Sequence, residues 1–231
     1  MRTTESGFDA YRTTYSEAVD DAVSFSGLKA DYFIRAKAER LVGLLRSTLG
    51  DPQALSVLDV GCGIGTYQPI LAGRIGKVSG VDPSVECIAE ARQRNPQFDY
   101  RAYDGVTLPH GDNEFDACYA ICVMHHVPTK MWSNFTSELA RVTRKDGLVM
   151  LFEHNPCNPL TRRAVSNCPF DADATLLSMK TAFQYFRTSG LKEIEGRYIL
   201  TIPSITGLVR RVDDLFWRLP IGAQYHVTGR P

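Results

Sequence analysis

The chain has 231 residues, of which 44% are hydrophobic and 23% are charged. This length suits one domain with a substantial core, and the composition is that of an ordinary soluble globular protein. Lysine and arginine together number 26, as do aspartate and glutamate, so the formal net charge is zero. That balance excludes a global field that would attract nucleic acid or an anionic membrane, although local charged patches remain open.

The sequence carries no recognisable targeting or membrane segment. No run approaches the roughly 18 apolar residues of a membrane-spanning helix, and the N-terminus has no apolar stretch behind its single basic residue. We therefore expect a cytoplasmic protein without an anchor. The six cysteines include no C-x-x-C pair and no histidine in finger-like spacing, which argues against structural zinc. Reduced, buried thiols are expected instead.

Strands and helices alternate along most of the chain. A helix is predicted over residues 28–49 and ends at the dipeptide Asp51-Pro52. An apolar run from Val57 then leads into a glycine-rich turn. The elements expected after it are helix 67–74, strand 77–82, helix 84–94, strand 97–103, strand 115–123, helix 130–143, strand 148–153, helix 176–188, strand 193–200 and strand 224–229. This alternation predicts a parallel, doubly wound α/β sheet.

Two segments, 154–175 and 201–221, exceed normal connection lengths and are expected to be lids or binding loops. In the second, residues 209–219 place apolar side chains at helical spacing, which predicts an amphipathic lid helix, with a membrane-surface helix as the alternative. Two arginine pairs are expected to lie at solvated positions. The alternative is that they bind an acidic or phosphorylated acceptor. The pairs are Arg162 with Arg163 and Arg210 with Arg211.

The glycine-rich turn runs from Asp59 through Gly61, Gly63 and Gly65. Because glycine lacks a Cβ atom, such a turn lets backbone N–H groups approach a ligand at the start of the next helix. A dinucleotide fingerprint, G-x-G-x-x-G/A, requires glycine or alanine at position 66, where this chain has Thr66. The spacing therefore disfavours a nicotinamide cofactor.

Acidic residues follow the next two predicted strands. Asp82 ends one strand about twenty residues beyond the glycine turn, where a carboxylate can accept the hydroxyls of a ribose. Capping of the helix that begins near Ser84 is the structural alternative, and both roles can coexist. Asp104 opens the pattern D-x-x-x-L-P-x-x-D-x-x-F-D, which leads into the strand that starts at Phe115.

In this order, the motifs resemble those of class I S-adenosylmethionine-dependent methyltransferases, in the broad small-molecule family that includes ubiquinone/menaquinone-type enzymes. The resemblance is clear over roughly residues 55–153. It implies the cofactor S-adenosyl-L-methionine and a Rossmann-like, seven-stranded, mostly parallel sheet with an antiparallel last strand. In that family the residue matching Asp104 reaches the adenine amino group. The cofactor-binding residues implied are Asp59, Gly61, Cys62, Gly63, Gly65, Asp82, Pro83, Ser84, Asp104, Gly105, Ala120 and Ile121.

The expected organisation is a single methyltransferase domain over residues 1–231. It comprises a helical cap (1–50), a cofactor-binding core (55–153) and the two long segments, 154–175 and 201–221, as insertions on the acceptor side. Lys37 and Arg35 of the cap are expected at solvated positions, with contact to the methionine carboxylate as the alternative.

Three residues are candidates for catalysis at the carboxyl edge of the sheet: His125, Glu153 and His154. His125 is the favoured base, because an ordinary imidazole accepts a proton near neutrality, and shaping the pocket is the equal alternative. Glu153 and His154 are adjacent on a strand, so at most one is expected to face the site. His126 is expected to be structural, because the matching residue in many relatives is a packing residue at the start of a helix. His110 is expected to be exposed, and His226 is expected to lie in a strand.

Methyl transfer to a small molecule is the expected function, with O-methylation ahead of N- or C-methylation because His125 and His154 offer bases. A sulfonium is a good leaving group, so the reaction requires no metal, and no metal site is predicted. Neither nucleic acid nor stable membrane association is expected. A non-catalytic S-adenosylmethionine-binding subunit is the alternative.

Overall fold

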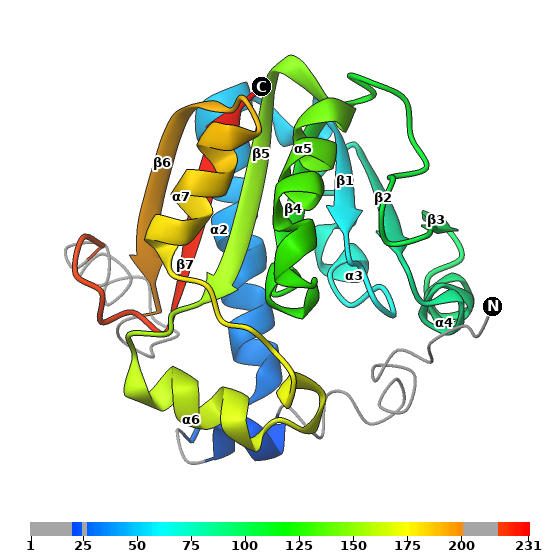
Figure 1. Ribbon diagram of the computed structural model, residues 1–231. Helices are drawn as coiled ribbons and strands as arrows, with labels where there is room; N and C mark the ends of the chain where they lie inside the picture. The colour runs from blue at the N-terminus through cyan, green and yellow to red at the C-terminus, as the bar shows by residue number, and fades with distance from the viewer. Residues whose placement is uncertain (1–19, 25–26, 201–216) are drawn as a thin grey trace.

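The computed structural model describes residues 20–24, 27–200 and 217–231. Seven strands form one sheet in the order β3-β2-β1-β4-β5-β7-β6 (Figure 1). The strands that pair in parallel are β1 (Ser56–Val60), β2 (Lys77–Asp82), β3 (Asp99–Ala102), β4 (Phe115–Ile121) and β5 (Thr143–His154). Strand β7 (Gln224–Arg230) runs antiparallel between β5 and β6 (Lys192–Ile199). The predicted α/β sheet with an antiparallel last strand is confirmed.

Helices cover both faces of the sheet (Figure 1). One face packs on α2 (Ala30–Leu49) and α3 (Gln68–Leu71), the other on α5 (Trp132–Val142) and α7 (Met179–Thr188), and α4 (Val85–Arg94) packs on β2 and β3. Alternation along β1 supplies both layers, since Val57 joins the α2 side while Leu58 and Val60 join the other. Because β1 to β5 run parallel, their carboxyl ends lie together at one edge of the sheet.

Several element boundaries differ from the prediction by a few residues, and two of the differences show their physical reason clearly. Helix α3 ends at Leu71 rather than at residue 74, because Ala72 has an extended ψ of 130° and Gly73 a φ of +69°. Strand β5 begins at Thr143 rather than at residue 148, because a register shift in its pairing with β4 lets Thr143 lie beside Phe115.

The segment 154–175 contains structure that the sequence analysis did not predict. It holds α6 (Pro159–Asn167), which lies across the carboxyl edge of the sheet, and the short 3₁₀ turn η6 (Pro169–Asp171) (Figure 1). The side chain of Asn158 accepts hydrogen bonds from the first amides of α6, a helix-start signal that was available in the sequence.

Asn155 ties this segment to the chain before β7. Its Nδ2 donates to the carbonyls of Pro220 (3.0 Å) and Gly222 (2.7 Å), and its backbone N–H donates to Ala223 (3.1 Å). These bonds anchor the start of the 154–175 segment beside the sheet.

Several predictions concern residues outside the described part of the chain. They are the cap over residues 1–19 and 25–26 and most of the amphipathic lid helix at 209–219, including Arg210 and Arg211.

Candidate active site

The glycine turn follows β1, and two of its positions leave no room for a side chain. Gly61 has a φ of +78°, and a Cβ atom there would lie 2.5 Å from Cγ2 of Val123. Gly65 has a φ of +76°, and its Cβ atom would lie 2.6 Å from the hydroxyl of Tyr100. Backbone conformation and close packing both require glycine at these two positions.

Asp82, at the end of β2, braces the same turn. Its Oδ2 accepts from the N–H of Gly63 (2.8 Å) and its Oδ1 from the N–H of Ser84 (2.9 Å). Ser84, preceded by Pro83, is itself the N-cap of α4, because its Oγ accepts from the N–H of Cys87 (3.0 Å). The cap belongs to Ser84 rather than to Asp82, whose carboxylate still has lone pairs for a ribose hydroxyl.

Asp59 lies beneath the turn. The residue is 2% exposed, and Nε2 of Gln68 donates to its Oδ2 (2.9 Å). Burial raises the pKa of Asp59 to about 7, against the effect of the Gln68 hydrogen bond. Three other predicted cofactor residues are buried close to the strand ends, namely Cys62, Ala120 and Ile121.

Asp104 and Gly105 lie in an exposed loop after β3. Oδ1 of Asp104 accepts from the N–H groups of Val106 and Thr107, both at 2.8 Å, and these bonds lower the pKa of the carboxyl. Tyr103, Gly105 and Val127 contribute to the lining of a small pocket beside this loop.

His125 and Glu153 form a buried pair at the ends of β4 and β5. Nδ1 of His125 lies 2.5 Å from Oε2 of Glu153, whose Oε1 accepts from the N–H of Met124 (2.8 Å). Burial disfavours the imidazolium, but attraction to Glu153 and contacts with Asp171 and Glu153 outweigh it and raise the pKa of His125 to about 10. This raised pKa counts against His125 as a proton acceptor at neutral pH.

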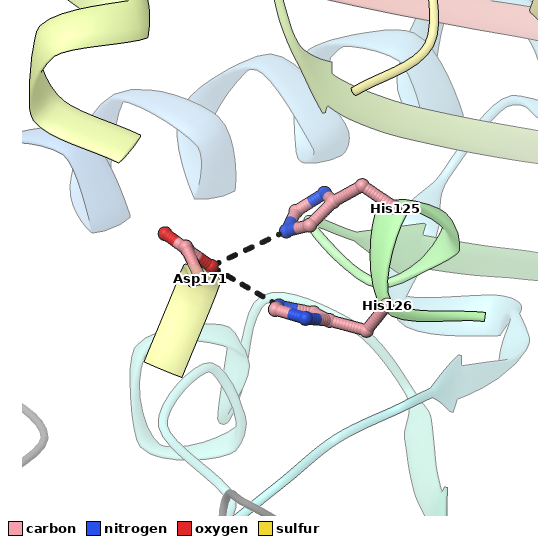
Figure 2. A group of neighbouring side chains, drawn as sticks. All are labelled: His125, His126 and Asp171. Atoms are coloured by element: carbon pink, nitrogen blue, oxygen red, sulfur yellow. Dashed lines mark ion pairs between the residues drawn. The ribbon is translucent and has the colours of Figure 1, made fainter. Parts of the chain in front are cut away.

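Asp171, which the sequence analysis did not single out, faces both neighbouring histidines (Figure 2). Its Oδ1 lies 3.2 Å from Nε2 of His126 and 3.6 Å from Nε2 of His125, and the longer separation is an ion-pair rather than a hydrogen-bond distance. The histidines come from the 3₁₀ turn η4 (Met124–His126) and Asp171 from η6. Since 45 residues separate Asp171 from His126, only the folded 154–175 segment brings them together.

His154 completes the cluster from the end of β5. Its ring centroid lies 5.2 Å from that of His125, and its Nδ1 lies 3.4 Å from Nε2 of Gln224. Glu153 and His154 thus both approach His125, Glu153 through its carboxylate and His154 through its ring. His154 is only partly buried, whereas Glu153 is fully buried.

A second polar contact that was not predicted joins α2 to the end of β4. Lys37 is 7% exposed, and its Nζ donates to Sγ of Cys122 (3.6 Å), so the expected solvated position is wrong for Lys37, whereas Arg35 is exposed. Burial disfavours a thiolate, but the charges of Lys37 and His154 lower the pKa of Cys122 to about 7.

The remaining histidines lie elsewhere. The His110 side chain is 1% exposed and its ring packs at 4.8 Å from that of Phe115, so the expected exposure is wrong. His226 lies in β7, as predicted.

Comparison with known proteins agrees with this arrangement. Residues 58–151, less than half of the chain, match the family model described as a methyltransferase domain, so this part of the chain resembles class I S-adenosylmethionine-dependent methyltransferases. S-adenosyl-L-methionine is accordingly its cofactor. None of the described helices combines the length and apolar character needed to cross a membrane.

Individual relatives are similar over part of their length. The chain is 32% identical over 108 residues to 2-methyl-6-phytyl-1,4-hydroquinone methyltransferase of Synechocystis sp., covering 45% of this chain and 33% of the relative. It is 37% identical over 73 residues to tRNA (carboxymethyluridine(34)-5-O)-methyltransferase of Saccharomyces cerevisiae, covering 32% of this chain and 25% of that relative. A methyltransferase structure from Archaeoglobus fulgidus superposes with a TM-score of 0.63 at 16% identity, over 84% of this chain and 94% of that one.

Proposed function

We propose that the chain transfers a methyl group from S-adenosyl-L-methionine to an oxygen atom of a small-molecule acceptor. The observation that carries this proposal is the polar cluster of His125, Glu153 and His154 beside the glycine turn. Gly61 of that turn packs against Val123, two residues before His125. The cluster therefore lies next to the part of the fold that holds the cofactor.

The chemistry needs a positioned acceptor and a place for its proton. The acceptor oxygen forms a bond to the methyl carbon as the carbon–sulfur bond breaks, releasing S-adenosylhomocysteine, and the hydroxyl proton leaves for a base. We assign the base to His154, because it is partly exposed and lies beside His125. His125 and Glu153 position the acceptor, since the pKa of His125, about 10, keeps its own proton in place at neutral pH.

The residues proposed to hold the cofactor follow from their places in the fold. Asp82 accepts the ribose hydroxyls, Asp104 lies at the adenine end, and the glycine turn holds the methionine part. Lys37 is a candidate partner for the methionine carboxylate, because its ammonium group lies at the end of β4 beside Cys122.

A small molecule is favoured over nucleic acid because the formal net charge is zero. The names of the relatives are compatible with either kind of acceptor, since one relative is named for a hydroquinone and another for a tRNA. The free state of all six cysteines supports the proposal of a cytoplasmic protein.

The test is transfer of a labelled methyl group from S-adenosyl-L-methionine to a panel of phenols, hydroquinones, sugars, carboxylic acids, amines and bulk tRNA. Label in an ether or ester product is expected. Transfer only to amines or carbon would contradict the assignment of oxygen as the acceptor atom. Transfer to tRNA would contradict the assignment of a small-molecule acceptor. Cofactor binding without any transfer would contradict the proposal that the protein is an enzyme.

His154→Ala should lower kcat about 10²–10⁴-fold with little change in cofactor affinity, because only proton removal is lost. His226→Asn, a change in β7 opposite Phe152, replaces a histidine outside the cluster; it is the matched control and should retain turnover in proportion to its folded fraction. Normal turnover of His154→Ala would remove His154 from the mechanism.

A further inference from the structure

We infer that His125, His126 and Asp171 bind a divalent transition-metal ion. Their ligand atoms, two imidazole nitrogens and one carboxylate oxygen, lie within 4.8 Å of one another. Figure 2 shows the rings of His125 and His126 facing the same carboxylate oxygen of Asp171. This inference goes beyond methyl transfer and does not depend on which acceptor the protein uses.

The separations fit ligands that share one metal ion. Zinc lies about 2.0–2.2 Å from nitrogen and oxygen ligands, so two ligands at a tetrahedral angle are about 3.3–3.5 Å apart. The measured separations from Oδ1 of Asp171 are 3.2 Å to His126 and 3.6 Å to His125. The second exceeds a normal N–H···O hydrogen bond, and a metal ion held between the two atoms accounts for this longer separation.

His125 is prepared as a ligand by Glu153. The carboxylate at Nδ1 occupies that side of the ring, so Nε2 is the nitrogen that faces Asp171 and would bind the metal ion. That Nε2 is buried, the residue is 2% exposed, and the atom has no hydrogen-bond partner among the described residues. A carboxylate on the outer nitrogen of a histidine is the usual support of a metal-bound imidazole.

Charge also favours a cation here. Glu153 and Asp171 are both buried, and within the described part of the chain their ion-pair partners are histidines, not lysines or arginines. Glu153 faces His125, and Asp171 faces both His125 and His126, so the two buried carboxylates need positive charge on the imidazoles or on a bound ion. A divalent ion supplies it, and Nε2 of His125 releases its proton to solvent as it becomes a ligand.

The donor set indicates the class of metal. Two imidazoles and one carboxylate suit zinc and its first-row neighbours, whereas magnesium prefers oxygen ligands. Three protein ligands leave at least one coordination position open, as in catalytic rather than structural zinc sites.

The experiment measures metal binding by the full chain in the absence of cofactor and acceptor. Protein stripped with a chelator is dialysed against Zn²⁺ or Mg²⁺ and the bound metal is quantified, with affinity taken from competition with a chromophoric chelator. One Zn²⁺ per chain and no retained Mg²⁺ are expected. Less than a tenth of an equivalent of Zn²⁺ on folded protein, or sulfur ligands in the X-ray absorption spectrum, would overturn the inference.

Variants assign the site. Asp171→Asn and His126→Gln should each weaken Zn²⁺ binding at least tenfold, and Glu153→Gln by about 10–100-fold through the loss of support to His125. Asp173→Asn changes an exposed carboxylate in the same segment and should bind Zn²⁺ normally. Circular dichroism and binding of S-adenosylhomocysteine show that each variant is folded. Unchanged Zn²⁺ affinity in folded Asp171→Asn and His126→Gln would refute the site, whatever the outcome of the methyl-transfer assays.

Discussion

Two buried histidines titrate in opposite directions because their neighbours differ. Burial lowers the pKa of His226 to about 3, with Arg40 and Arg197 adding to the effect. His125 is equally buried, yet two carboxylates raise its pKa to about 10. The sequence analysis treated His125 as an ordinary imidazole that accepts a proton near neutrality and placed His226 in a strand. Only the contacts of the folded chain separate the neutral histidine from the charged one.

Asp59 should make the stability of the protein depend on pH. Its pKa is about 7 in the folded chain against an ordinary 3.8, so its stabilising contribution is complete below pH 3.8 and is lost as the pH rises through 7. The Asp59→Asn side chain stays neutral at every pH. The free energy of unfolding of the variant, relative to that of wild type, should therefore rise between about pH 4 and pH 8, by at most about 4 kcal/mol.

Urea unfolding of both proteins at pH 4, 6 and 8 measures this difference. Asp146→Asn, at an exposed position, is the control and should follow the wild-type curve. Parallel pH dependences for wild type and Asp59→Asn would mean that the Asp59 carboxyl is ionised in the fold.

Among the elements, those with long, regular patterns were predictable. The run from Val57, the alternation of strands and helices, and the break at Asp51-Pro52 identified the sheet and most of its helices within a few residues. Helix α6 was missed because few of its nine residues are apolar and its start is set by one side chain, Asn158, in a segment rich in loop-forming residues. Strand β5 was predicted too short because its first residues pair across a register shift.

Asn155 should hold the 154–175 segment in place. Asn155→Ala leaves the carbonyls of Pro220 and Gly222 without their amide donor and should lower the free energy of unfolding by about 1–3 kcal/mol. Amide hydrogen exchange should also rise in residues 155–175 before it rises in the sheet.

Chemical unfolding and exchange by mass spectrometry provide the two measurements. Ser166→Ala removes only an exposed local hydrogen bond to Arg163 and serves as the control. If Asn155→Ala melts like wild type with unchanged exchange, the segment is held by its apolar contacts instead.

At the scale of the whole molecule, the two halves of the candidate site differ in how far the sequence reveals them. The proposed cofactor half uses residues that follow successive strands, and parallel pairing brings their carboxyl ends together. Gly61 and Asp82 could therefore be proposed from order and spacing, and Asp104 from the family resemblance. The acceptor half depends on contacts between distant segments. Asp171 meets His126 only after the 154–175 segment crosses the sheet edge. The contact of Lys37 with Cys122, on the side proposed for the cofactor, likewise joins residues 85 positions apart. Neither contact has a local pattern that could predict it.

The fold as a whole should discriminate between adenosine cofactors. A ligand that binds only the native state stabilises it by RT ln(1 + [L]/Kd), about 2.7 kcal/mol at a hundredfold excess over Kd. S-adenosylhomocysteine should therefore raise the unfolding temperature, whereas NAD should not, because Thr66 departs from the dinucleotide spacing. Asp82→Ala should reduce the shift, since it removes the carboxylate that accepts from Gly63 and Ser84 and is proposed to accept the ribose.

Thermal unfolding over a range of ligand concentrations gives the affinities, and Asp146→Ala, at an exposed position, should behave as wild type. The affinity of Asp82→Ala should fall by roughly 1–3 kcal/mol in binding free energy. Stabilisation by NAD but not by S-adenosylhomocysteine would contradict the cofactor assignment. An unchanged shift in Asp82→Ala would confine Asp82 to its structural role, which is to connect the glycine turn to the start of α4.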